Sequence, residues 1–157
     1  MVTVGENLKE RAELLEGTQW TEDLSWKEIE IFVRYLDTSR IKKDIPVFYE
    51  GAREAYMCIV VKGSVKVLKK NEKNQGKTLS VLTKGKTFGE MVLFDGEPRS
   101  ATIVSADETV LLILTRENLD RLIKEAPGLA AKILLKLGKL LSQRLRITSG
   151  RLVDFID

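Results

Sequence analysis

The sequence predicts a mainly β fold with flanking helices, a double-stranded β-helix (jelly roll or β-roll) with N-terminal helices and a long C-terminal helix. Three observations predict this class. Helical patterns occupy residues 6–16 and 25–36, short β-type runs separated by turn signals fill residues 37–114, and helical patterns return after residue 115. Several short strands at regular spacing are typical of a barrel or jelly roll.

Two short helices are expected before the strands. Residues 6–16 form the first, and Gly17 ends it. Ser25 and Glu28 have the spacing of a capping box for a second helix that runs through about Leu36. One apolar stripe of the second helix is expected to pack against the sheet, and it consists of Trp26, Ile29, Phe32, Val33 and Leu36.

Seven strands are expected where β-branched and aromatic residues gather between turn signals. The polar loop 71–76 is the expected tip of a hairpin, with solvated side chains. Cys58 lies in the apolar run 56–61 and is expected to be a buried, inert thiol. The predicted strands are residues 38–42, 46–49, 56–62, 64–70, 77–82, 101–105 and 109–114.

The last part of the chain predicts two helices. Thr115 is the expected N-cap of a helix over residues 116–124, and Pro127 suits the first turn of a longer helix over about 127–147. This helix has more apolar width than one sheet face needs. Homodimerisation through the helix and burial within one chain both explain the width. Its apolar residues are Leu129, Ala130, Ile133, Leu134, Leu135, Leu137, Leu140, Leu141 and Leu145.

Composition favours a binding module over an enzyme. The chain has no histidine and one cysteine, so a histidine-ligated metal, a cysteine-rich zinc site and a histidine-activated nucleophile are all excluded. We therefore expect no metal, no cofactor and no catalytic residues. The net charge of +3 is too small to indicate nucleic acid. The basic side chains of residues 132–151 fit a solvated face, with nucleic-acid or membrane-surface contact as the alternative.

Compartment and domain content follow from absences in the sequence. A single cysteine permits no internal disulfide, which indicates a reducing, cytoplasmic setting. No apolar run approaches the ~20 residues of a membrane span, so no membrane is expected as a partner. Because the sequence ends at Asp157, no DNA-binding helix-turn-helix is expected to follow the last helix.

Residues 85–103 concentrate the recognition chemistry. Gly89 and Glu90 stand at the start of a short helical turn, and Arg99 follows about ten residues later. A helix N-terminus and a planar guanidinium both suit a phosphate. A carboxylate repels phosphate but accepts from hydroxyls, so Glu90 is better suited to a sugar. The stretch therefore predicts a ligand that carries a phosphate beside a sugar hydroxyl.

The order of these elements resembles the cyclic nucleotide-binding domain family over roughly residues 18–147. Residues 88–102, FGEMVLFDGEPRSAT, are similar to the phosphate-binding cassette of that family, and residues 48–51 and 60–63 are similar to its turn glycines. Asp44 is a departure, because family members often have glycine there. We expect the effect of Asp44 to be local and away from the pocket.

The resemblance implies a role for each cassette residue. Glu90 would accept from the ribose 2′-hydroxyl, and Arg99 would pair with the cyclic phosphate. The long helix would close over the base as a lid, although no motif fixes which of its residues do so. Two groups would assist: the backbone of Gly89, Met91 and Ala101 with the Ser100 hydroxyl at the phosphate, and Leu79 and Ser80 at the base.

The resulting expectation is one cyclic nucleotide-binding domain over residues 1–157, with a helix and β-roll part at 18–125 and a lid or dimer helix at 126–149. It would be a regulatory switch without chemistry of its own, signalling to a separate effector protein. Cyclic AMP is favoured over cyclic GMP, because Ser100 lies in a context that looks like a bacterial activator. The alternative function is a scaffold module of the same fold that binds no ligand and works through its C-terminal helix.

Overall fold

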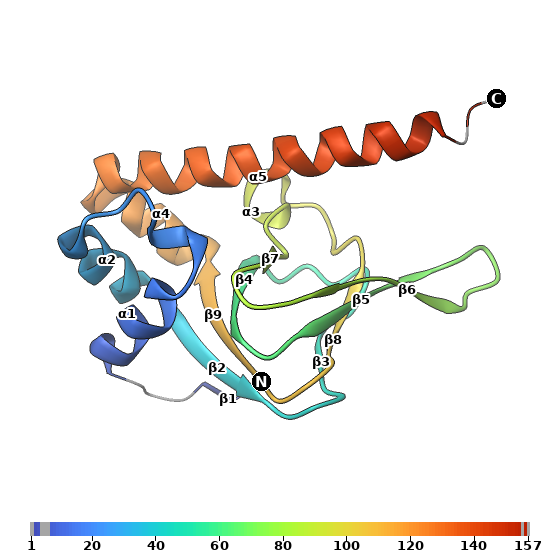
Figure 1. Ribbon diagram of the computed structural model, residues 1–157, viewed down its shortest axis with the longest axis horizontal. Helices are drawn as coiled ribbons and strands as arrows, with labels where there is room; N and C mark the ends of the chain where they lie inside the picture. Colours follow the sequence, from blue (N-terminus) through green and yellow to red (C-terminus); the bar gives the residue numbers. More distant parts are fainter. Residues whose placement is uncertain (1, 4–6, 155, 157) are drawn as a thin grey trace.

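Two antiparallel sheets form the centre of the computed structural model, which describes residues 2–3, 7–154 and 156 (Figure 1). One sheet has the order β1-β2-β9-β4-β7 and the other the order β3-β8-β5-β6. The predicted mainly β jelly roll with flanking helices is confirmed. The strands are β1 (Val2–Thr3), β2 (Asp37–Ile41), β3 (Pro46–Phe48), β4 (Tyr56–Lys62), β5 (Val65–Lys70), β6 (Gly76–Leu82), β7 (Thr87–Phe88), β8 (Thr102–Ser105) and β9 (Thr109–Thr115).

All seven predicted strands are present, with ends displaced by at most one residue. Strands β1 and β7 were not predicted, because a two-residue strand shows no periodicity in the sequence. The 71–76 loop does form the tip of the β5–β6 hairpin, as expected. Asp44 has a left-handed φ of 63° in the turn before β3, which explains why glycine suits this position, and Asp44 does not line the cavity described below.

Helices cover the outer face of the first sheet (Figure 1). Ser25 and Glu28 form the predicted capping box, with bonds of 3.2 and 3.0 Å. The prediction for Trp26 was wrong: its side chain is 49% exposed at the first turn, whereas the rest of its stripe is buried. Residue 6 of the first predicted helix lies outside the described residues. The helices are α1 (Leu8–Glu16), η1 (Gln19–Thr21), α2 (Trp26–Phe32), η2 (Val33–Tyr35), α3 (Val92–Asp95), α4 (Arg116–Glu125) and α5 (Pro127–Val153).

Strand β4 separates two hydrophobic cores. Side chains alternate across a strand, so Met57 and Ile59 enter the core under the helices, while Cys58 and Val60 enter the core between the sheets. This explains why the whole run is apolar. Cys58 is fully buried as predicted, and burial raises the pKa of its thiol.

The long helix α5 has a packed first half and a projecting second half. Its first half buries four apolar side chains, and Lys132 and Lys136 form 3.0 Å ion pairs with Glu28 and Asp23. The second half continues six residues beyond the predicted end and runs over the β5–β6 side of the molecule (Figure 1). Leu145 is 67% exposed there, so this part of the apolar width lies outside the described core.

No helix among the described residues combines the length and the apolarity that crossing a membrane requires.

Candidate functional site

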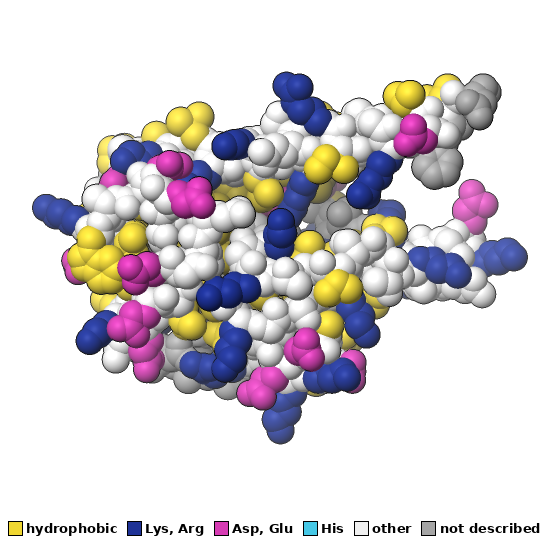
Figure 2. Space-filling view, viewed as in Figure 1, with side chains coloured by type: hydrophobic (Ala, Val, Ile, Leu, Met, Phe, Trp, Pro, Cys, Tyr) yellow, Lys and Arg dark blue, Asp and Glu magenta, His cyan; other side chains and the backbone are white. Residues whose placement is uncertain are grey.

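A cavity of about 620 Å³ opens between the β5–β6 hairpin, residues 88–101 and the second half of α5. Figure 2 shows it as a hollow between two projecting arms, with lysine and arginine side chains around its mouth. The eight residues predicted to bind ligand all line it. They are Leu79, Ser80, Gly89, Glu90, Met91, Arg99, Ser100 and Ala101.

At Gly89, where the cassette begins, the backbone lies close to the side chain of Arg99 and to Phe48 and Tyr56. Gly89 follows β7 with a φ of +75°, a conformation that side chains disfavour. A Cβ atom there would lie 2.7 Å from Arg99 Nη1, 3.2 Å from the Phe48 ring and 3.2 Å from the Tyr56 carbonyl oxygen. Only glycine therefore lets Arg99 lie against the start of the cassette.

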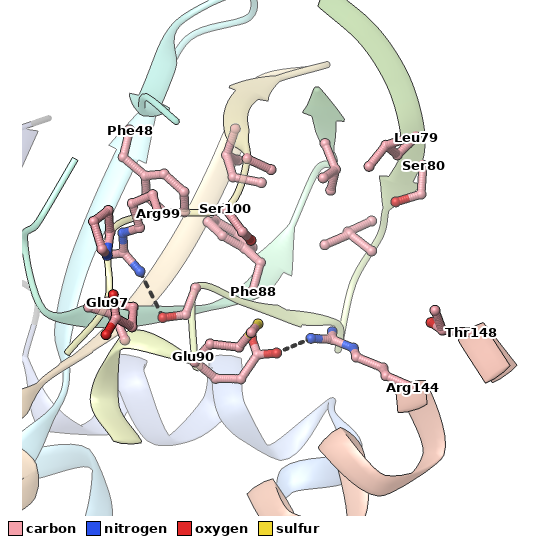
Figure 3. Close-up of a pocket in the computed structure, with 18 of the residues that line it drawn as sticks. Phe48, Leu79, Ser80, Phe88, Glu90, Glu97, Arg99, Ser100, Arg144 and Thr148 are labelled. Atoms are coloured by element: carbon pink, nitrogen blue, oxygen red, sulfur yellow. Dashed lines mark hydrogen bonds and ion pairs between the residues drawn. The ribbon is translucent and has the colours of Figure 1, made fainter. Parts of the chain in front are cut away.

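Glu90 is almost completely buried at 3% exposure, and its partner comes from α5. Arg144 of α5 donates to Glu90 Oε1 (Figure 3). It also donates to the carbonyl oxygen of Thr87. The sequence did not identify Arg144, because helical periodicity does not fix which arginine of a basic run meets a carboxylate 54 residues earlier in the chain. The predicted ribose carboxylate is thus joined to α5 directly.

Arg99 is a buried cation that is satisfied by backbone carbonyls. It is 5% exposed, and it donates from Nη1 to Gly89 (2.7 Å) and from Nη2 to Tyr56 (2.6 Å). No described carboxylate forms an ion pair with it, and its buried Nε has no partner. Burial lowers the pKa of Arg99, because desolvation disfavours its charged form. A buried cation without a countercharge is suited to an anionic ligand.

Two aromatic rings complete the surroundings of Arg99. Its Cζ lies 3.9 Å from the centroid of Phe48 and 4.6 Å from that of Tyr56, within cation–π range. Burial also raises the pKa of Tyr56 to about 12. The Tyr56 hydroxyl therefore stays neutral at physiological pH and supplies no countercharge to the guanidinium.

A β-bulge places two neighbouring residues of β6 on the same cavity. Adjacent residues of a strand normally face opposite sides. Here the β5–β6 register shifts, so that Val67 pairs with Ser80 and Leu68 pairs with Thr78. Leu79 is the extra residue, and both Leu79 and Ser80 line the cavity (Figure 3).

The opposite wall of the cavity comes from α5. The sequence predicted this helix but could not specify which of its residues form the wall. Arg144, Ile147, Thr148 and Arg151 line the cavity from positions three or four residues apart, on one face of the helix. The cavity thus has a cationic end at Arg99, a buried carboxylate at Glu90 and an apolar slot with hydroxyls between β6 and α5. This arrangement can hold an anionic ligand with a sugar hydroxyl and a flat apolar group.

Comparison with known proteins agrees with this geometry. A family model described as "Cyclic nucleotide-binding domain" matches residues 38–126. The chain is 32% identical over 132 residues to the cyclic AMP receptor protein of Thermus thermophilus, and 31% identical over 117 residues to a cGMP-dependent protein kinase of Toxoplasma gondii. A solved cyclic nucleotide-binding domain of Methylobacillus flagellatus has a TM-score of 0.81 at 28% identity, covering 93% of this chain and 82% of that one.

These curated relatives are longer than the matched region. The matches cover 84% and 74% of this chain but only 59% of the Thermus protein and 11% of the Toxoplasma kinase. The similarity therefore concerns only a part of each relative.

Proposed function

Because this chain belongs to the cyclic nucleotide-binding domain family, we propose that it is a regulatory sensor whose cavity binds a cyclic nucleotide. One observation carries the proposal: Arg99, a buried guanidinium without an ion-pair partner among the described residues, lines the same cavity as the buried carboxylate of Glu90. These two groups suit the phosphate and the ribose of one small ligand.

The phosphate and ribose positions follow from the unused hydrogen-bonding capacity of both groups. Arg99 retains an unpaired Nε–H, and each terminal nitrogen carries a second N–H. Glu90 accepts from Arg144 through Oε1, which leaves Oε2 for the ribose 2′-hydroxyl. The backbone of Gly89, Met91 and Ala101 and the Ser100 hydroxyl would assist at the phosphate.

The base would lie between β6 and α5. Leu79 offers apolar surface, and the hydroxyls of Ser80 and Thr148 can each donate or accept. We propose cyclic AMP as the preferred ligand over cyclic GMP, on the basis of Ser100 in its cassette. The Thermus relative is named as a cyclic AMP receptor, while the Toxoplasma relative is named for cyclic GMP. Competition binding with both nucleotides tests this preference.

Closure of α5 over the base is the proposed switch. Arg144 already connects α5 to Glu90, so a ligand at Glu90 acts on a contact that the lid helix makes. A ligand can favour the closed state only by binding it more tightly than the open one. The signal would pass to a separate effector protein.

Thermal unfolding with added nucleotide is the direct test. A ligand at 100 times its dissociation constant should add ~2.7 kcal/mol to the free energy of unfolding. No shift with cyclic AMP or cyclic GMP, even at saturating concentrations, would contradict the proposal. It would favour the alternative of a scaffold module that works through α5.

Glu90→Gln should weaken cyclic nucleotide binding by ~1.5–3 kcal/mol, the range for a hydrogen bond to a charged group. The amide keeps the size of the side chain but removes the charge that Arg144 and the ribose hydroxyl share. Calorimetry measures the change. Glu72→Gln, in the exposed hairpin tip, is the matched control and should leave affinity unaltered. If Glu90→Gln and Glu72→Gln bound the nucleotide with equal affinity, a ribose role for Glu90 would be excluded.

We also propose that α5 mediates a homodimer. Its exposed residues include a stripe spaced alternately by three and four, as in a coiled-coil seam. Small residues in the stripe would let two helices approach closely. The stripe consists of Leu135, Gly138, Ser142, Leu145, Ser149 and Leu152.

Leu145→Lys should therefore convert a dimer to a monomer in light scattering coupled to size-exclusion chromatography, because a charge at the centre of the seam would be desolvated. Ile123→Lys, at an exposed position of α4, is the matched control and should remain dimeric. A wild-type chain that is monomeric at all concentrations tested would refute the dimer.

A further inference from the structure

We propose that Phe48 is a positioning residue, which holds the plane of the Arg99 guanidinium in the orientation that receives an anion. The inference rests on the proposed function, since the anion is the phosphate of the ligand. It adds a residue from outside residues 88–102, at the end of β3. Figure 3 shows Phe48 beside Arg99 at the wall of the cavity.

The position of Phe48 is set by β3. The register of β3 against β8 shifts between Pro46 and Phe48, and Phe48 then pairs with Ile103. The Phe48 ring is buried and lines the cavity. Its centroid lies 5.9 Å from that of Phe88, the residue before Gly89. One ring therefore contacts both the entry of the cassette and the arginine near its end.

The ring and two carbonyls together restrict the guanidinium. Phe48 lies 3.9 Å from Arg99 Cζ, closer than Tyr56 at 4.6 Å. Bonds to the carbonyl oxygens of Gly89 and Tyr56 fix rotation within the plane. One N–H on each terminal nitrogen remains for a ligand.

Phe48 also stabilises the charge while no ligand is bound. Arg99 is buried without a described ion-pair partner, and an aromatic face attracts a cation more strongly when both are desolvated. Leucine at this position would fill much of the volume but supply no such face. The guanidinium would then sample other orientations, and an anion would have to order it on binding.

Phe48→Leu should weaken cyclic AMP binding about tenfold, which corresponds to ~1.4 kcal/mol. Phe48→Tyr keeps the aromatic face and should bind within about twofold of wild type. Tyr49→Leu also replaces an aromatic ring by leucine, at the exposed neighbour of Phe48, which does not line the cavity. It should leave affinity unchanged. Equal losses in Phe48→Leu and Tyr49→Leu would overturn the proposal.

A double-mutant cycle separates positioning from direct ligand contact or general packing. Phe48→Leu added to Arg99→Ala should cost no further affinity, because the group that Phe48 orients is gone. An undiminished further loss would show that the ring acts on the ligand or the fold directly, and would refute the proposal. Because Arg99→Ala should bind ligand weakly, calorimetry with a competing ligand is used to measure affinity in this variant and in the double variant.

Arginine side-chain NMR supplies a readout without ligand. In the wild type, the Arg99 guanidinium should show separate terminal N–H signals because its rotation is hindered, and Phe48→Leu should average them. Averaged signals in the wild type would show that the guanidinium rotates freely and would overturn the proposal. If the wild type bound no cyclic nucleotide, the proposed function itself would fail. Binding that Phe48→Leu leaves unaltered would overturn only the role of Phe48.

Discussion

Replacement of Arg99 by alanine should weaken cyclic nucleotide binding by ~2–5 kcal/mol, the cost of removing one partner of a buried charge pair. This is about 30-fold to several thousand-fold in dissociation constant. The guanidinium is the buried cation of the cavity that has no described ion-pair partner, so the ligand phosphate would lose its countercharge. Calorimetric titration measures the loss, with circular dichroism to verify the fold.

Arg99→Lys is the informative companion. It retains the charge but lacks the planar fork that donates to Gly89 and Tyr56 and stacks on Phe48. We expect Arg99→Lys to lose most of the same affinity. A change below threefold for Arg99→Ala in a folded protein would remove the basis for assigning the phosphate to this residue.

Gly89→Ala should destabilise the protein and also impair ligand binding. A positive φ costs a non-glycine residue ~1–2 kcal/mol. The added Cβ would also meet Arg99 Nη1 at 2.7 Å and the Tyr56 carbonyl at 3.2 Å. Arg99 would be displaced from the position in which it faces the cavity. Chemical denaturation gives the stability change, and calorimetry gives the affinity.

Gly96→Ala isolates the backbone contribution. Gly96 has a φ of +66° at the end of α3, and nothing lies within 4 Å of its would-be Cβ. We expect a stability loss of ~1–2 kcal/mol with affinity retained. If Gly89→Ala and Gly96→Ala behaved alike in both measurements, the close approach of Arg99 to Gly89 would have no consequence for binding.

Local sequence signals predicted those features that depend on neighbouring residues. The capping box at Ser25 and the N-cap at Thr115 are contacts over three residues. The strands of residues 37–115 follow from short apolar runs between turns. The cassette could be placed because its glycine, carboxylate and arginine occur within about ten residues of one another.

Features that depend on distant segments were missed. Arg144 meets Glu90 only because α5 folds back over β7, and no periodicity specifies that register. Trp26 carried the right helical phase, but it lies in the first turn of α2 and is exposed, whereas the rest of its stripe is buried. Phe48 could not be placed beside Arg99 because their contact joins β3 to the end of the cassette.

Helix α5 is packed in its first half and projects in its second half. Its last buried side chain, Leu137, marks the boundary between the two halves. At 1.5 Å per residue, Arg144 lies ~10 Å beyond this point and Val153 ~24 Å beyond it. If α5 bent at Leu137 under the proposed closure, the packed first half would stay in place. The distal end would then move through about twice the displacement of Arg144.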